Sequence, residues 1–329
     1  MKIKDILQIK YGKNQSSVID ENGKYPIIGT GGIFGYATKY LYNKPSVLIG
    51  RKGSINNPMY VDTPFWTVDT LFYTIIDTSK VIPRWFYYYI STLNLNKFNE
   101  GTTIPSLTTK TLYEIDVPEH SLNYQQHIVD IIGSLDDKIE NNNKIINKLW
   151  QKLQLIHTDF KSKNELVEKN ILELADIKYG KGIPTSEILK DGLYSVYGSN
   201  GIIGYLNNYT FKEHKIAISC RGNSSGIIHL TDENSTVTSN SLVLDFKNFD
   251  YTYYFFLEFM YKGLYEYKTG SAQPQITIDN LKILNLQVPK NINDYIKNIN
   301  DSVEYTFCLK KENQKLFLLK QFYLKKFFG

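Results

Sequence analysis

The longest regular pattern in the chain places a core-type residue at alternating steps of four and three. It is carried by Ile128, Ile132, Leu135, Ile139, Asn142, Ile146, Leu149, Leu153, Ile156 and Phe160. This spacing is a heptad seam, which predicts one long helix packed along another helix. Asn142 is polar. It either pairs with a polar partner and fixes the register of the helices, or marks a wet or frayed point of the seam.

A second and less regular apolar stripe begins at Ile292. Its members are Ile296, Ile299 and Val303, followed in a shifted phase by Leu309, Leu316, Leu319 and Tyr323. One amphipathic helix of this length cannot bury its stripe alone. We therefore expect the two long helices to pack on each other as an antiparallel coiled coil.

Short apolar runs separated by Gly, Asn and Pro predict strands in the rest of the chain. The clearest runs cover residues 46–50, 58–62, 70–76, 215–220, 226–230 and 241–246. Two aromatic runs, 83–95 and 251–263, predict short helices. We expect their aromatic rings to pack in a core, and the alternative is that they stack on unpaired bases.

Five stretches of the first half recur in the same order in the second half, about 168 to 171 residues later. The pairs are ILQIKYGK and LADIKYGK (6–13 and 174–181), GTGGIFGY and GSNGIIGY (29–36 and 198–205), VLIGRKGS and IAISCRGN (47–54 and 216–223), GTTIPSLTTKTL and GSAQPQITIDNL (101–112 and 270–281), and IDVP and LQVP (115–118 and 286–289). Five matched pairs in one order indicate an internal duplication.

The duplication predicts an α+β fold in which a mixed α/β domain followed by a long helix occurs twice. The expected segments are 1–122 for the first domain, 123–163 for the first helix, 164–291 for the second domain and 292–329 for the second helix. Two similar domains on a helical spacer suit a ligand with two separated halves. Duplex DNA is one such ligand, because its grooves repeat along the helix axis.

Composition narrows the classes of protein only slightly. The 329 residues carry a net charge of +5, which permits nucleic-acid binding without requiring it. The two cysteines, Cys220 and Cys308, have no metal-binding spacing and suit a reducing cytoplasm. The N-terminal residues do not resemble a signal peptide, and we find no run of apolar residues long enough to span a membrane.

The glycine-rich stretch at 29–36 invites comparison with a nucleotide-binding loop. However, Phe34 stands where the last glycine of GxGxxG would be, and no acidic residue follows at the expected strand end. A Walker A motif is also absent. Because the stretch recurs at 198–205, we interpret both copies as scaffold turns in which glycine supplies a positive φ.

Other catalytic patterns are equally weak. NPMY at 57–60 resembles the NPPY motif of amino-methyltransferases, but it lacks the second proline, and no cofactor-binding βαβ unit precedes it. We expect a surface turn before a strand there. The five histidines show no metal-ligand spacing, and we expect His127 and His157 on the surface of the long helix. The sequence therefore predicts no catalytic, metal or cofactor site.

The order of these repeated motifs resembles the specificity subunits of type I restriction–modification systems over essentially the whole chain. The resemblance rests on the five repeated pairs and on LNYQQHIVDIIGSLDDKIENNNKIINKL at 122–149 as the spacer helix. In that family the helix usually opens with Glu-Gln. Here Gln125-Gln126 opens the first copy and Asp294-Tyr295 the second, so the second helix departs from the pattern.

The resemblance implies a non-catalytic subunit whose two target recognition domains each read one half of a split sequence in double-stranded DNA. It implies that the helices dock two methyltransferase subunits, which carry S-adenosylmethionine and methylate DNA. In a complete system a restriction/translocase subunit with ATP and Mg would join the complex in the cytoplasm, without a membrane. The alternative is a twin-domain interaction protein that binds a bipartite partner other than DNA.

DNA binding requires cations for phosphates and forked polar groups for base edges. We look for them in loops present in both halves, at polar positions that differ between the copies. The candidates are Lys13, Asn14, Gln15, Arg51, Lys52, Ser54, Thr102, Thr103 and Lys110 in the first half, and Lys181, Thr185, Arg221, Asn223, Ser224, Ser271, Gln273 and Gln275 in the second. For the two arginines, the alternative is that they brace their loops through carboxylates or carbonyls.

Overall fold

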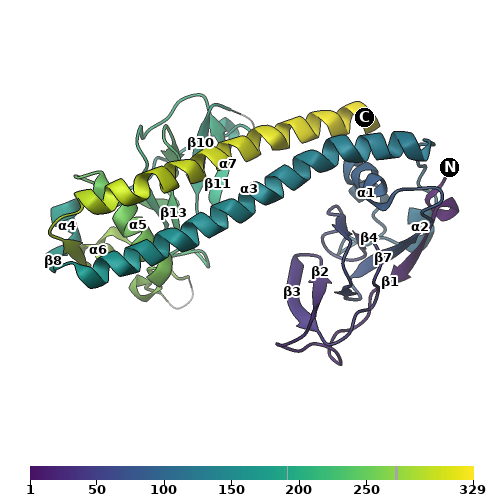
Figure 1. The fold of residues 1–329 in the computed structure, drawn as a ribbon, viewed down its shortest axis with the longest axis horizontal. Helices are drawn as coiled ribbons and strands as arrows, with labels where there is room; N and C mark the ends of the chain where they lie inside the picture. The colour runs from purple at the N-terminus through teal and green to yellow at the C-terminus, as the bar shows by residue number, and fades with distance from the viewer. Residues whose placement is uncertain (191, 271–272) are drawn as a thin grey trace. The chain divides into compact units, whose positions relative to one another are not determined.

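The computed structural model describes residues 1–329 except Asp191, Ser271 and Ala272. The described residues form two compact units. Unit 1 consists of Met1–Asn141 and Asn313–Gly329, and unit 2 of Asn142–Glu312. The boundaries cut through both long helices, so each unit holds one globular part and parts of both helices (Figure 1). None of the described helices has the length and apolar character needed to cross a lipid bilayer.

Unit 1 builds its globular part from seven short strands and two short helices before the first long helix. They are β1 (Leu7–Tyr11), β2 (Tyr25–Gly29), β3 (Gly32–Ala37), β4 (Ser46–Gly50), β5 (Met59–Val61), β6 (Trp66–Thr67), β7 (Leu71–Ile76), α1 (Pro83–Thr92) and α2 (Thr109–Tyr113). The first long helix is α3 (Leu122–Lys163). One sheet has the antiparallel order β1-β7-β4-β5. The other has the order β3-β2-β6, in which β2 and β6 are parallel.

Unit 2 repeats these elements in the same order. Its elements are β8 (Leu166–Asn170), α4 (Ile171–Leu174), β9 (Ala175–Tyr179), β10 (Tyr194–Gly198), β11 (Gly201–Leu206), β12 (Ile216–Ser219), β13 (Ile228–Leu230), β14 (Thr236–Val237), β15 (Ser241–Phe246), α5 (Asp250–Lys262), α6 (Ile278–Lys282), β16 (Asn285–Pro289) and α7 (Asn293–Phe328). The sheets β9-β15-β12-β13 and β11-β10-β14 match the two sheets of unit 1. The predicted duplication of an α+β domain is confirmed.

The repeat extends to details of strand pairing. The β2–β3 hairpin shifts register between Ile27 and Ile28, and the β10–β11 hairpin does so between Val196 and Tyr197. One difference is that β8 and β16 form a two-stranded sheet in unit 2, whereas the bridge between Lys2 and Asp116 stands at the corresponding place in unit 1. The six predicted strands and the two aromatic helices all occur.

The aromatic clusters form cores, as predicted. In unit 1 the buried face of α1 places Trp85, Phe86 and Tyr88 in the main apolar cluster. In unit 2 the corresponding cluster is built around Tyr253–Leu257 of α5. Helix α1 begins with Pro83 at its first turn, where the missing N–H costs no hydrogen bond.

The long helices pack in antiparallel directions within each unit. In unit 1, Ile128 and Ile132 of α3 share an apolar cluster with Leu324 near the end of α7. In unit 2, Leu153 near the end of α3 shares a cluster with Ile299 near the start of α7. Most of the predicted seam is therefore buried or half-buried.

Asn142 resolves one of the alternatives left open by the seam. Its side chain is buried, and Nδ2 donates to Glu312 Oε2 at 2.7 Å. The two residues are 170 positions apart, within the range of the repeat offset, so this position pairs with its own repeat mate. A polar partner at this position fixes the register of the helices.

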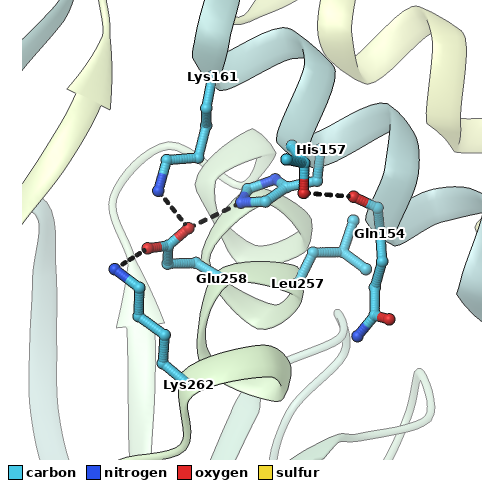
Figure 2. Close-up of a pocket in the computed structure, with 7 residues that line it drawn as sticks. Gln154, His157, Lys161, Leu257, Glu258 and Lys262 are labelled. Carbon is cyan, nitrogen blue, oxygen red and sulfur yellow. Dashed lines mark hydrogen bonds and ion pairs between the residues drawn. The ribbon is translucent and has the colours of Figure 1, made fainter.

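Two positions on the long helices differ from prediction. His157 is buried, not on the surface: one ring nitrogen lies 2.9 Å from Tyr295 Oη. The other lies 2.9 Å from Glu258 Oε2 (Figure 2). The heptad pattern could not predict this burial, because a third helix, α5, covers His157. Leu319 is exposed, because the buried stripe of α7 passes through Leu324 instead. His127 is exposed, as predicted.

The sequences at the starts of the two long helices differ, and so do the hydrogen bonds that their residues make. Gln125 is buried: its Oε1 accepts from the N–H of Ile82 at 2.9 Å, and its Nε2 donates to the carbonyl of Lys80 at 3.0 Å. In α7 the buried Tyr295 bonds to His157 instead. The two copies thus secure the start of their helices with different polar groups.

Candidate nucleic-acid interface

Three predicted loops of unit 1 are joined by backbone hydrogen bonds through one short segment, 67–70. The N–H of Lys13 donates to the carbonyl of Thr67 at 2.9 Å, and the N–H of Arg51 donates to that of Thr70 at 2.9 Å. Arg51 in turn accepts from the N–H of Leu107 at 2.9 Å. The loops at 13–15, 51–54 and 101–110 therefore meet, although they are far apart in sequence.

Unit 2 repeats this arrangement through the segment 237–240. The N–H of Ser239 donates to the carbonyl of Lys181 at 3.0 Å, and the N–H of Cys220 donates to that of Asn240 at 3.1 Å. The carbonyl of Cys220 accepts from the N–H of Ile276 at 3.0 Å. We call each such set of three loops and its joining segment a loop junction. Each unit contains one.

A glycine in the repeated KYGK motif makes each loop junction possible. A Cβ on Gly12 would lie 2.0 Å from the carbonyl oxygen of Val68, and a Cβ on Gly180 would lie 2.3 Å from that of Thr238. Both contacts are with backbone, which cannot move aside as a side chain can. The motif therefore marks a close approach of two chain segments.

The two candidate arginines differ in their surroundings. Arg51 Nη1 donates to the carbonyl of Asp69 at 2.9 Å, and its guanidinium carbon lies 5.2 Å from the centre of the Tyr11 ring. Arg51 therefore makes a loop-bracing hydrogen bond, which was the alternative to a contact with a base. Arg221 is exposed and forms a β-bridge with Gln275. Burial raises the pKa of the neighbouring Cys220 thiol, although Arg221 acts in the opposite direction.

Most of the other candidates lie on exposed parts of these loops. Exposed residues are Lys13, Asn14, Lys52, Ser54, Thr102, Thr103, Lys110, Lys181, Thr185, Asn223, Gln273 and Gln275, while Gln15 and Ser224 are half-buried. Ser271 lies outside the described residues. Lys52 bridges to Ser106, which joins its loop to 101–110 a second time. Lys110 on α2 and Thr185 in the 3-10 helix Thr185–Glu187 have no hydrogen bond to the joining segments among the described residues.

The joining segments themselves escaped the sequence reasoning. Asp69 and Ser239 are exposed at matching positions, as is Asn240, while Thr70 is half-buried. They directly precede the repeated strands β7 and β15, and they differ between the copies. The criterion applied to the other loops, polar positions that vary beside a constant scaffold, would have selected them.

The glycine-rich hairpins lie against the same loop junctions. The N–H of Val68 donates to the carbonyl of Ile28 at 3.3 Å in unit 1, and that of Thr238 donates to Tyr197 at 2.8 Å in unit 2. The predicted turns are confirmed, with φ of 105° at Gly32 and 92° at Gly201.

Each hairpin also presents an apolar side chain that sequence reasoning assigned to scaffold. Phe34 lies over Gly29 and is 53% exposed, and Ile203 lies over Gly198 and is 49% exposed. The signal that could have identified them is the repeat itself, which holds an apolar residue at a strand position facing solvent in both copies.

The loop junction of unit 2 borders a basic cavity of about 440 Å³. Its walls include Lys178, Lys181, Lys212 and Lys215, together with the acids Glu213 and Asp245. Lys178 and Lys215 pair with Asp245 at 2.8 and 2.7 Å. Burial would raise the pKa of Asp245, but hydrogen bonds from the two lysines outweigh it and lower the pKa. Lys181 and Lys212 have no recorded ion pair among the described residues, so their charges are available to an anion.

The loop junctions offer cations, amides and hydroxyls. Among the described residues, no group of three or more His, Cys, Asp or Glu side chains could hold a metal ion. What the loop junctions provide is exposed polar groups on rigid turns, beside lysines. Such a surface can contact phosphates and base edges.

Comparisons with known proteins agree with this description. The sequence profile of a family described as type I restriction modification DNA specificity domain matches residues 1–151 and 163–321. The type I restriction enzyme MjaIX specificity subunit of Methanocaldococcus jannaschii is 26% identical in an alignment that covers 47% of this chain. The chain spans only 41% of that relative's length.

A solved structure covers the whole chain. The S subunit of a type I restriction–modification system from M. genitalium matches with a TM-score of 0.65 at 19% identity. The match covers 100% of this chain and 95% of that one. At this identity the match establishes the fold.

Proposed function

The chain belongs to the type I restriction modification DNA specificity domain family, with a match in each half, and from this premise we propose that it reads double-stranded DNA for partner subunits. Each globular part, 1–122 and 164–291, reads one half of a bipartite target. The two long helices are the spacer and dock two methyltransferase subunits. The chain itself performs no catalysis.

The observation that carries this proposal is the loop junction, which occurs once in each unit with the same backbone connections and different exposed side chains. A constant scaffold with variable polar tips is what two readers of different half-sites require. Arg51 and Arg221 suit guanine, and Asn223, Asn240 and Gln275 suit adenine. Lys13, Lys52, Lys181 and Lys212 suit phosphates.

The proposed partners supply the chemistry. Each methyltransferase subunit binds S-adenosylmethionine, the source of the methyl group, and methylates an adenine that is flipped from the duplex. A restriction/translocase subunit using ATP and Mg²⁺ completes the system, which works in the cytoplasm. This chain needs no cofactor of its own for that role.

The test is to co-express the full chain with the methyltransferase subunit of the same system and map methylated bases by long-read sequencing. The expected result is a split motif with a fixed gap and a methylated adenine in each half. Replacing residues 1–122 by the matching segment of another family member should change only one half of that motif. An unmethylated genome, from an assembled complex supplied with S-adenosylmethionine, would overturn the proposal.

Salt dependence separates DNA reading from the alternative of a bipartite partner other than DNA. Binding to duplex DNA should weaken steeply as salt rises, because phosphate contacts release counterions. Binding to a partner other than DNA that does not change with salt, without affinity for duplex DNA, would favour the alternative.

A further inference from the structure

The side chain of Arg51 is held at two points of the unit 1 loop junction. Its Nη1 donates to the carbonyl of Asp69 at 2.9 Å. Its guanidinium carbon lies over the Tyr11 ring, 5.2 Å from the ring centre, where the ring attracts a cation. The backbone of Arg51 is fixed as well, since its N–H donates to Thr70 and its carbonyl accepts from Leu107.

The Tyr11 ring is itself oriented, although it is 52% exposed. Tyr11 ends β1 on the side of that strand that carries the buried Leu7 and Ile9, and it pairs directly with Phe72 of β7. The two rings meet edge to face, with their centres 5.1 Å apart. Phe72 is fully buried. A buried ring therefore orients Tyr11, and Tyr11 in turn orients the guanidinium of Arg51.

These contacts leave most of the guanidinium available to a ligand. Arginine has five N–H donors in a rigid fork. Among the described residues, the only acceptor recorded for the Arg51 side chain is the one at Nη1, so Nε and Nη2 can donate side by side. Two parallel donors in a fixed plane match the O6 and N7 acceptors of guanine in the major groove.

The repeat shows that this pair of side chains is not part of the common scaffold. The KYGK motif of unit 2 supplies Tyr179 at the position of Tyr11, and its ring is 45% exposed. The backbone hydrogen bonds made by Arg51 are made in unit 2 by Cys220, which is buried. Tyr179 lines the basic cavity instead. Both units thus present the tyrosine, but only unit 1 places an arginine over it.

We propose that Tyr11 is the positioning residue that presents the Arg51 guanidinium to a guanine in the half-site of unit 1. The proposal rests on the DNA reading proposed above and deepens it. The ring fixes the plane of the guanidinium before DNA binds, so less side-chain freedom is lost on binding. Arg221 stands at the place of Lys52 in the repeat, one position after that of Arg51. The arrangement is therefore specific to unit 1.

The experiment measures binding of the full chain, assembled with its methyltransferase subunit, to duplexes with single base-pair changes in the unit 1 half-site. The methylated motif supplies the reference sequence. Arg51→Ala should remove the preference for guanine at one base pair of that half-site and nowhere else. Tyr11→Leu should reduce the same preference about fivefold, as expected for the loss of one cation–π contact. Tyr11→Phe keeps the ring and should stay within about twofold of the wild type.

A double-mutant cycle shows whether the two side chains act as a unit. Because Tyr11 acts through Arg51, adding Tyr11→Leu to Arg51→Ala should cause no further loss of preference. The matched control Tyr179→Leu should leave the preference for guanine unchanged in both half-sites, because Cys220 stands where unit 1 has its arginine.

Hydrogen exchange of β1 and β7 shows whether each variant is folded. If Tyr11→Leu is destabilised, Tyr11→Ile removes the ring with a side chain that suits a strand.

Four results would overturn the inference. The first is an unchanged preference in Tyr11→Leu. The second is an equal loss in Tyr11→Phe and Tyr11→Leu, which would assign the effect to the hydroxyl. The third is additive losses in the double-mutant cycle. The fourth is uniform weakening on all sequences in Arg51→Ala, with a smaller dependence on salt, which would make Arg51 a phosphate contact. Failure of DNA reading itself is seen separately, as a wild-type complex that prefers no sequence.

Discussion

Both units join the globular part to a long helix through a tyrosine and an acid, and unit 2 adds a second acid. In unit 1, Asp136 of α3 accepts from Tyr88 of α1 at 2.8 Å and pairs with Lys320 of α7 at 2.6 Å. In unit 2, Glu304 of α7 accepts from Tyr253 of α5 at 3.0 Å. Unit 2 also pairs Glu258 of α5 with Lys161 of α3 at 2.6 Å.

The unit 2 cluster is the more elaborate of the two. Figure 2 shows Glu258 between His157, Lys161 and Lys262, beside a cavity of about 210 Å³. Unit 1 has a groove of about 540 Å³ between α1 and α7, and none of the described Asp or Glu side chains lines it. Unit 2 thus places an acid beside its cavity, whereas the unit 1 groove has only basic, neutral polar and apolar side chains in its walls.

The largest effects should come from the glycines that both units share. We expect Gly12→Ala or Gly180→Ala to destabilise its own loop junction by roughly 3 kcal/mol, because the new Cβ would overlap a carbonyl oxygen of the backbone. Hydrogen exchange of β1 and β9 measures the effect in each unit separately. Gly31→Ala and Gly182→Ala are matched controls, because nothing lies within 4 Å of either position. Equal behaviour of all four variants would contradict the close approach.

The next largest effect should separate the two polar clusters. We expect Glu258→Gln to destabilise unit 2 by roughly 2 kcal/mol, because it leaves three basic groups without their anion. Asp136→Asn should cost unit 1 only about 1 kcal/mol, because a neutral amide can still accept from Tyr88. Hydrogen exchange of α5 and α1 reports the two losses. A larger loss in unit 1 would reverse the ranking of the clusters.

The unit 2 cluster should also make that unit sensitive to acid. Burial would raise the pKa of Glu258, but hydrogen bonds from His157, Lys161 and Lys262 hold the pKa far below its ordinary value of 4.5. A carboxylate with a lowered pKa in the folded state contributes stability above pH 4.5, and the contribution is lost as pH falls below it. Exchange of α5 should accelerate on acidification in the wild type and much less in Glu258→Gln. The same pH dependence of α5 exchange in the wild type and in Glu258→Gln would contradict this explanation.

The two arginines provide a comparison of readers. Arg221→Ala should reduce recognition of its half-site by about tenfold or more, as expected for one bidentate contact to guanine, without changing the stability of unit 2. Arg51→Ala should also destabilise unit 1, because Arg51 holds the carbonyl of Asp69. Methylation assays on paired half-site mutants and thermal melts measure both. If neither variant changes DNA affinity or sequence preference, the arginines are not readers.

Much of this arrangement could be predicted from the sequence, and the failures have a common physical cause. The first long helix follows from a heptad pattern within one segment, and the duplication follows from five motifs that recur in the same order. The burial of His157 could not be predicted, because it depends on α5, which is distant in sequence. Asp69 and Asn240 vary beside repeated strands and could have been selected from the sequence, but their place in the loop junctions depends on hydrogen bonds between distant loops.

The smallest effect should come from the apolar tips of the hairpins. We expect Phe34→Ser and Ile203→Ser to alter preference at one base position of the corresponding half-site, by less than roughly fivefold, because an apolar contact with a thymine methyl is weaker than a bidentate hydrogen bond. Competition binding with single-base variants of each half-site measures the change. Leu193→Ser is the control, because Leu193 is also exposed but precedes β10, at the end away from the hairpin turn. A change in the other half-site, or the same change in the control, would show that the hairpins serve only as scaffold.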